Sequence, residues 1–206
     1  QLFPDYGFLT EESQDTGERL KKRCIFIVDP VDGTKEFVSR NGQFTTNIAL
    51  VVDHEVVAGV INVPMLQKLY YAVKGQGAYR INPDGSVDAI HVSDRKDHLR
   101  AMRSVSFFND EEKAFMEAHK DRFEGEAEAV GAANKFGALA EGSKDFFFRC
   151  SGGTKEWDVC SGDIILAEAG GIMVQPNGEK FTYNREYVYN REGYVMANCR
   201  ENLFLK

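Results

Sequence analysis

Five acidic residues occupy places in the chain where they could bind a metal ion. Asp29 and Asp32 lie three apart in "VDPVDGT", Asp158 lies in "EWDVCSGD", and Glu11 and Glu12 lie in "LTEES". Hard divalent cations such as Mg²⁺ take oxygen ligands, usually a few carboxylates together with phosphate and water. If these side chains converge, they form a metal site. If they do not, each is an ordinary turn, capping or surface residue.

The turn between the two aspartates favours convergence. Proline fixes φ, so the Pro-Val-Asp segment can turn both carboxylates to one side and expose the carbonyl of Val31. Gly33 and Thr34 then offer backbone N–H groups at the start of a helix, a position that suits an anion. The same pattern is also typical of a plain strand-to-helix turn, and the spacing alone leaves both interpretations open.

The elements that must position these residues follow from the pattern of apolar residues. The run at 23–29 predicts a buried strand that ends at Asp29. A short helix is expected over 34–40, with Thr34 or Asp32 as its cap. The β-branched runs and glycine-rich turns of residues 40–92 predict a mostly antiparallel sheet, including a hairpin over 44–64.

The pattern changes near residue 95, where helical periodicity begins. We therefore expect two parts: a sheet-rich N-terminal lobe over 1–95 with the "DPVDGT" loop, and an α/β C-terminal lobe over 96–206 with the "WD" motif. In the second lobe the sequence predicts helices over 110–123, 133–142 and 156–171, a strand over 145–150, a strand–turn–strand set over 172–181 and a closing strand over 193–199.

Composition excludes several classes of function. The net charge is −7 and no basic block is present, which argues against a nucleic-acid polymer as partner. No apolar run approaches the ~18–20 residues of a membrane span. The four cysteines are far apart, without a CxxC pair, which favours reduced thiols in a cytoplasmic protein. A phosphate-ester substrate would need local positive charge, and a divalent metal is the natural source.

Two motifs together carry a resemblance to a known family. "VDPVDGTKEF", followed by "NGQFTTNIALVV", and "WD", followed by "GDIILAEAGG", resemble the inositol monophosphatase superfamily of Mg²⁺-dependent, lithium-sensitive phosphatases. The resemblance covers nearly the whole chain. It implies an α/β fold, the layered α+β sandwich of the sugar phosphatases, here lacking its first two helices. Within the superfamily, "DGTKEF", "GAANKF" and "GGTKEWD" are most similar to the 3′(2′),5′-bisphosphate nucleotidases.

The resemblance also implies roles for individual residues. Two or three Mg²⁺ ions would be held by these groups: Glu11, Asp29, the Val31 carbonyl, Asp32 and Asp158. Catalysis would fall to Thr34, Asp32 and Glu11, with Thr34 orienting the attacking water. The substrate would be bound by Gly33, Thr34, Gly131, Ala132 and Lys135. Glu12 would lie beside the metal ligands.

Three functions remain open at this point. The first is removal of the 3′-phosphate of adenosine 3′,5′-bisphosphate (PAP), with PAPS as a further substrate, by a monomer or homodimer. The second is an inositol monophosphatase or inositol polyphosphate 1-phosphatase. The third is an inactive fragment that binds metal and phosphate, because the resemblance implies roughly 50–60 further residues before Gln1, within ordinary domain sizes. In the family, that segment forms two helices and supplies an aspartate that acts with Thr34. Without it, an exposed apolar sheet surface is expected.

Overall fold

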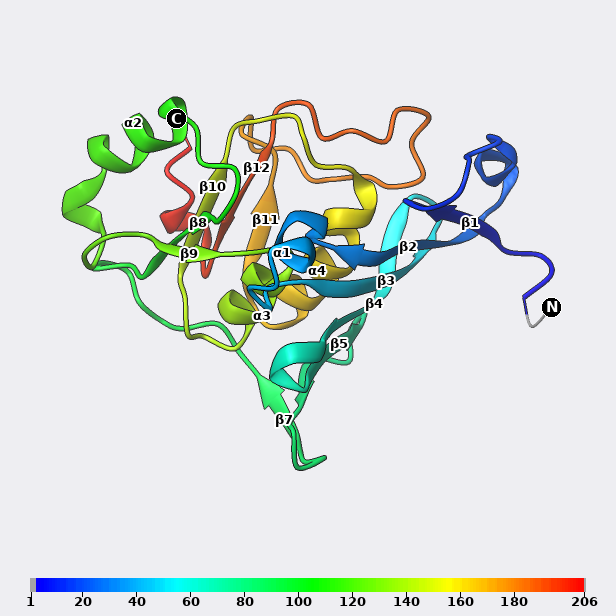
Figure 1. Ribbon diagram of the computed structural model, residues 1–206, viewed down its shortest axis with the longest axis horizontal. Coiled ribbons are helices and arrows are strands. Elements are labelled where there is room, and N and C mark those ends of the chain that lie inside the picture. Colours follow the sequence, from blue (N-terminus) through cyan, green and yellow to red (C-terminus); the bar gives the residue numbers. More distant parts are fainter. Residues whose placement is uncertain (1–2, 206) are drawn as a thin grey trace.

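The computed structural model describes residues 3–205, which form two β-sheets with helices between and beside them (Figure 1). The larger sheet has seven strands in sequence order. They are β1 (Gly7–Thr10), β2 (Cys24–Asp32), β3 (Thr45–Val52), β4 (Glu55–Val63), β5 (Lys68–Val73), β6 (Ala78–Ile81) and β7 (Val87–Ile90). β1 runs parallel to β2, and all other neighbours are antiparallel. The antiparallel sheet predicted for residues 40–92 is thus confirmed.

The second sheet has five strands and mixed pairing. Its order is β11 (Ile172–Val174), β12 (Tyr194–Ala197), β10 (Phe146–Arg149), β8 (Ala101–Ser104) and β9 (Glu128–Val130). β10, β8 and β9 are parallel to one another, whereas β12 is antiparallel to both β10 and β11. The expected strand over 145–150 and the closing strand are present, but the second strand expected within 172–181 is not.

Four α-helices and four short 3₁₀ turns complete the described chain. The helices are α1 (Thr34–Val38), α2 (Asp110–Ala118), α3 (Asn134–Ala140) and α4 (Glu156–Glu168). The 3₁₀ turns are η1 (Glu18–Lys21), η2 (Pro64–Leu66), η3 (Lys120–Arg122) and η4 (Arg200–Asn202). The helices expected over 110–123 and 156–171 are therefore shorter than the sequence suggested. No helix within the described chain is long and apolar enough to cross a membrane.

α3 and α4 lie between the two sheets, and α4 packs on the inner face of β2, β3, β4 and β5 (Figure 1). Close approach requires glycine at two points. A Cβ at Gly59 of β4 would lie 2.6 Å from the Ser161 carbonyl oxygen of α4, and a Cβ at Gly162 would lie 2.2 Å from the ring of Phe136 of α3. This packing fixes the start of α4 relative to the end of β2.

Two apolar clusters flank the five-stranded sheet. Phe147 joins the larger cluster between the sheets, whereas Phe146 joins a second cluster that Phe115 of α2 helps to cover. Neighbouring phenylalanines of β10 thus point to opposite faces, as strand geometry requires. The outer face of the seven-stranded sheet is apolar and open: Phe8 is 47% exposed and Ile48 is 40% exposed. The exposed apolar sheet surface that the sequence suggested is present.

Candidate functional site

A β-bulge turns Asp29 and Asp32 to the same side of the sheet. In a regular strand, residues three apart point to opposite faces. Here Asp29 pairs with Asn47 and Asp32 with Thr45, so three steps along β2 match two along β3. The extra residue in β2 restores a common direction. The prediction that the strand ends at Asp29 was therefore wrong, because β2 continues through the proline to Asp32.

Three carboxylates from three elements meet beside this bulge. Pairing of Thr10 with Val28 in the parallel β1–β2 ladder places Glu11 beside Asp29. Asp158 is the third residue of α4, and its Oδ2 accepts a hydrogen bond of 2.6 Å from the backbone N–H of Lys155. One ligand oxygen of each of Glu11, Asp29 and Asp158 lies within 4.8 Å of the others. This acidic cluster could hold a metal ion. Glu12 is exposed and lies outside it.

Asp29 shows that the cluster fits a cation. Its side chain is fully buried; Oδ1 accepts the Val31 N–H at 3.0 Å, but Oδ2 has no hydrogen-bond partner. Burial, reinforced by the charges of Asp32, Asp158 and Glu11, raises the pKa of Asp29 to about 9. Burial, followed by the charge of Asp32, raises the pKa of Asp158 to about 7. Lys155 Nζ already pairs with Glu11 Oε1 at 3.4 Å. Neither Asp29 nor Asp158 forms an ion pair within the described chain, so ionisation of all three carboxylates requires a further positive charge.

Asp32 is held by neighbours that the sequence did not single out. Its Oδ2 accepts hydrogen bonds from Thr45 Oγ1 at 3.2 Å and Asn47 Nδ2 at 3.1 Å, and both donors are buried. Burial raises the pKa of Asp32, and the positive charge of Lys135 opposes that rise. Burial in turn lowers the pKa of Lys135 to about 8. Polar residues at alternate positions of a β-branched strand were the available signal for this support.

The start of α1 differs from the expected cap. Gly33 is the cap residue, with φ of +86°, rather than Thr34 or Asp32. This conformation suits glycine, and a Cβ at Gly33 would also lie 3.0 Å from the Cβ of Ala132. The Thr34 hydroxyl donates to the Val31 carbonyl at 3.5 Å, at the outer limit of a hydrogen bond. The hydroxyl and carbonyl that the resemblance singles out therefore face each other.

A pocket of about 430 Å³ opens over these groups. All but two of the predicted site residues line it. The exceptions are Asp29, which is buried, and Val31. Gly131, Ala132 and Lys135 lie in the pocket wall as expected, although the Gly131 N–H already donates to Gln43 Oε1 at 2.7 Å. Their predicted role toward a nucleotide stays a prediction.

The pocket also contains a buried cation that sequence reasoning missed. Arg149, at the end of β10, is only 7% exposed. Its Nη1 donates to Ser104 Oγ at 3.3 Å, and its Nε has no partner. Within residues 3–205, it forms no ion pair. A buried guanidinium without a carboxylate partner is costly and is available to an anion in the pocket. The feature of the sequence that could have indicated this residue is an arginine at the end of the apolar run "FFF".

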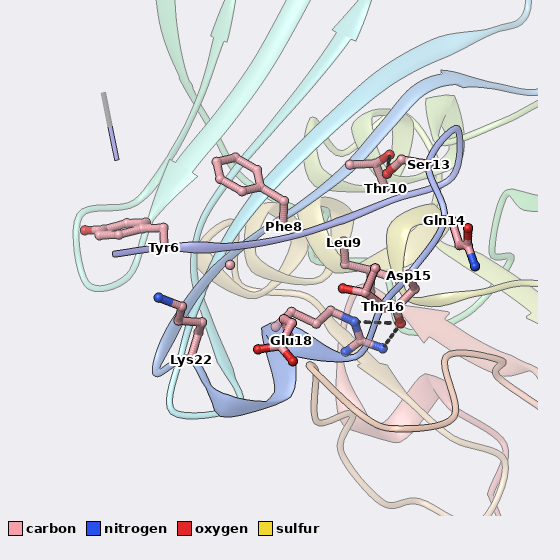
Figure 2. Close-up of a pocket in the computed structure, with 12 residues that line it drawn as sticks. Tyr6, Phe8, Leu9, Thr10, Ser13, Gln14, Asp15, Thr16, Glu18 and Lys22 are labelled. Atoms are coloured by element: carbon pink, nitrogen blue, oxygen red, sulfur yellow. Dashed lines mark hydrogen bonds and ion pairs between the residues drawn. The ribbon is translucent and has the colours of Figure 1, made fainter. Parts of the chain in front are cut away.

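A separate cavity of about 220 Å³ lies between β1 and the turn that leads into η1 (Figure 2). Its buried cation, Arg19, is already paired. Arg19 donates to Asp15 at 2.7 Å and to Asn184 Oδ1 at 2.8 Å. The predicted site residues lie outside this cavity, and we assign it no chemistry.

Comparison with known proteins places this geometry in a family. Residues 1–203 match the inositol monophosphatase family. The 3′(2′),5′-bisphosphate nucleotidase CysQ of Aggregatibacter actinomycetemcomitans is 34% identical over 200 residues, which cover 95% of this chain and 73% of that protein. The crystal structure of CysQ from Bacteroides thetaiotaomicron has a TM-score of 0.84 at 32% identity, over 94% of this chain and 78% of that one.

A more distant structure, 2′AMP-bound SaIMPase-II, has a TM-score of 0.77 at 25% identity, over 95% of this chain and 72% of that one. These matches confirm the layered α/β fold implied by the sequence motifs. The two-motif pattern, the fold and the acidic cluster agree, and the chain belongs to the inositol monophosphatase family.

Proposed function

We propose that this chain is a Mg²⁺-dependent, cytoplasmic 3′(2′),5′-bisphosphate nucleotidase, which removes the 3′-phosphate of PAP and acts on PAPS in the same way. The metal-dependent phosphomonoesterase chemistry follows from the family and the acidic cluster. The choice of a bisphosphate substrate rests on Arg149. Similarity to nucleotidases named CysQ supports the same choice.

Arg149 supplies a second anion site in the pocket that contains the acidic cluster. If the phosphate to be cleaved lies beside Thr34 and the metal that Asp32 and Asp158 would hold, Arg149 is left for another negative group. Two unit charges 4 Å apart attract by about 4 kcal/mol at an effective dielectric constant of about 20. The positive charge of Arg149, which has no carboxylate partner, therefore favours a bisphosphate over a monophosphate.

The site residues would have separate roles in the reaction. Glu11, Asp29, Asp32 and Asp158 would hold Mg²⁺, together with the Val31 carbonyl. When bound, Mg²⁺ neutralises phosphate charge and lowers the pKa of the attacking water. The Thr34 hydroxyl, now turned toward Val31, would orient that water. Phosphoryl transfer needs position and charge neutralisation more than covalent catalysis, so the absence of a cysteine or serine nucleophile from this scheme is no obstacle.

Phosphate release from three substrates tests this function. PAP, adenosine 3′-monophosphate and inositol 1-phosphate are compared with Mg²⁺ present. We expect the bisphosphate to react fastest. Arg149→Met should lower kcat/KM for PAP by about tenfold or more, as expected for one lost charged hydrogen bond. It should leave the monophosphate nearly unchanged. Arg23→Met, at an exposed arginine paired with Asp53, is the matched control.

Two outcomes would oppose the proposal. Faster release from inositol 1-phosphate would favour an inositol monophosphatase. If this chain released no phosphate from any ester, while a version extended before Gln1 did, the chain would be an inactive metal- and phosphate-binding fragment.

A further inference from the structure

A second cation lies beside Arg149 at the same pocket. Lys35 is the second residue of α1, directly after Thr34, and its side chain is exposed. Its Nζ lies 4.1 Å from the ring centroid of Phe107. The guanidinium carbon of Arg149 lies 5.2 Å from the same centroid. One aromatic ring in the pocket wall therefore contacts two cations, and this contact limits where each can move.

The residue next to Phe107 is hydrogen-bonded to the helix that carries Lys35. The neighbouring Ser106 hydroxyl donates to Glu36 Oε1 at 2.6 Å, and Glu36 is only 5% exposed. Because Glu36 belongs to α1, this hydrogen bond ties the segment after β8 to that helix. Phe107 itself is 49% exposed although it lines the pocket. A large apolar side chain is thus held half in water beside two positive charges.

Neither cation forms an ion pair within the described chain, although the charge of Arg149 opposes the rise that burial causes in the pKa of the Glu112 carboxyl. Like Arg149, Lys35 forms no ion pair with any carboxylate of the described chain. The pocket wall also contains the carboxylates of Glu11, Asp32, Glu36 and Asp158, but none of them forms an ion pair with Lys35 or Arg149. Like charges near each other disfavour the empty pocket and favour one that holds an anion.

We infer that Lys35 is a specificity-determining residue that contacts the phosphate that is not cleaved, together with Arg149, and that the Phe107 ring holds Lys35 in place for this contact. The inference rests on the proposed function and adds a residue, Lys35, to its second anion site. The uncleaved phosphate does not change during the reaction. Its contacts are therefore equal in the ground and transition states, and their loss raises KM while kcat stays nearly constant.

The variant Lys35→Met tests the inference. We expect kcat/KM for PAP to fall about tenfold, through KM, because one charged hydrogen bond is lost. The value for adenosine 3′-monophosphate, which lacks the second phosphate, should not change. Lys35→Arg should retain the preference for the bisphosphate. Lys113→Met, at an exposed lysine of α2, is the matched control. Phe107→Leu should reduce the preference about two- to fivefold, the range of an exposed cation–π contact.

Inhibition supplies a second readout that does not depend on turnover. Adenosine 5′-monophosphate carries only the phosphate that would remain after cleavage. Lys35→Met should weaken its inhibition about tenfold, again one charged hydrogen bond, and leave inhibition by adenosine unchanged. If the variant affected both substrates equally, or neither, Lys35 would not contact the second phosphate. The inference would then be overturned while a wild-type preference for PAP stood. If the wild type showed no preference for PAP, the proposed function would fail and the inference with it.

Discussion

Replacement of Asp29 with asparagine should weaken metal binding while leaving the metal-free protein folded. Asparagine has nearly the same shape as aspartate, and the side chain is fully buried. In the metal-free protein, burial and neighbouring charges raise the pKa of Asp29 to about 9. Its carboxyl group is then mostly neutral at pH 7, so the substitution removes little charge from the metal-free fold. Metal binding, in contrast, needs the ionised group.

The expected size of the effect follows from linkage between binding and folding. At a Mg²⁺ concentration of 100 times Kd, one bound ion adds about 2.7 kcal/mol to the free energy of unfolding. Loss of one charged ligand should weaken binding by roughly 3 kcal/mol, or about 100-fold, on the scale of charges at 4 Å. The same concentration would then stabilise Asp29→Asn by only about 0.4 kcal/mol. For a chain of this size, 1 kcal/mol shifts Tm by about 2–4 °C.

Thermal unfolding with EDTA and with Mg²⁺ measures how much the bound metal stabilises the wild type and the variant. The wild type should gain about 5–11 °C from Mg²⁺ and Asp29→Asn about 1–2 °C. In EDTA at pH 7, Asp29→Asn should unfold at a higher temperature than the wild type, because asparagine, unlike aspartate, needs no proton to occupy the buried site. Asp121→Asn, at an exposed residue of η3, should behave as the wild type. Equal stabilisation of Asp29→Asn and the wild type would refute the assignment of Asp29 as a metal ligand.

Two further predictions concern the same carboxylates. Because the pKa values of Asp29 and Asp158 are raised in the fold, the folded state binds more protons than the unfolded state above pH ~4. The free energy of unfolding in EDTA, measured by urea unfolding, should therefore fall from pH 5 to pH 8. Asp29→Asn should make this fall less steep. A rise in the free energy of unfolding over this range would contradict the raised pKa values. Thr45→Val removes a donor to Asp32, so Mg²⁺ affinity measured by calorimetry should fall about 10–100-fold. Thr182→Val, at an exposed threonine, should leave it unchanged, and equal affinities for both variants would oppose this role.

Local sequence patterns were sufficient for the parts of the site that depend on neighbouring residues. The apolar run of β2 ending in aspartates, and Asp158 at the start of α4, follow from periodicity and capping preference. The hairpin of β3 and β4 follows from alternation of β-branched residues. The two signature motifs then linked these segments through a family resemblance.

Features that depend on contacts between distant segments could not be predicted. The bulge between Asp29 and Asp32 depends on the register with β3. The short strand β9 acquires its pairing only from β8. The unpaired state of Arg149 depends on which carboxylates the fold brings near it. Helix ends were also uncertain: α2 ends at Ala118, before the apolar residue Phe123 that suggested a longer helix.

Phosphate release from PAP, with Mg²⁺ and then with excess EDTA, tests the central claim most directly. The proposed two-motif metal site predicts release with Mg²⁺, loss of release in EDTA, recovery when Mg²⁺ is restored, and slower release from inositol 1-phosphate. Release that persists in EDTA, or faster release from the inositol ester, would contradict the claim that this chain is a metal-dependent bisphosphate nucleotidase.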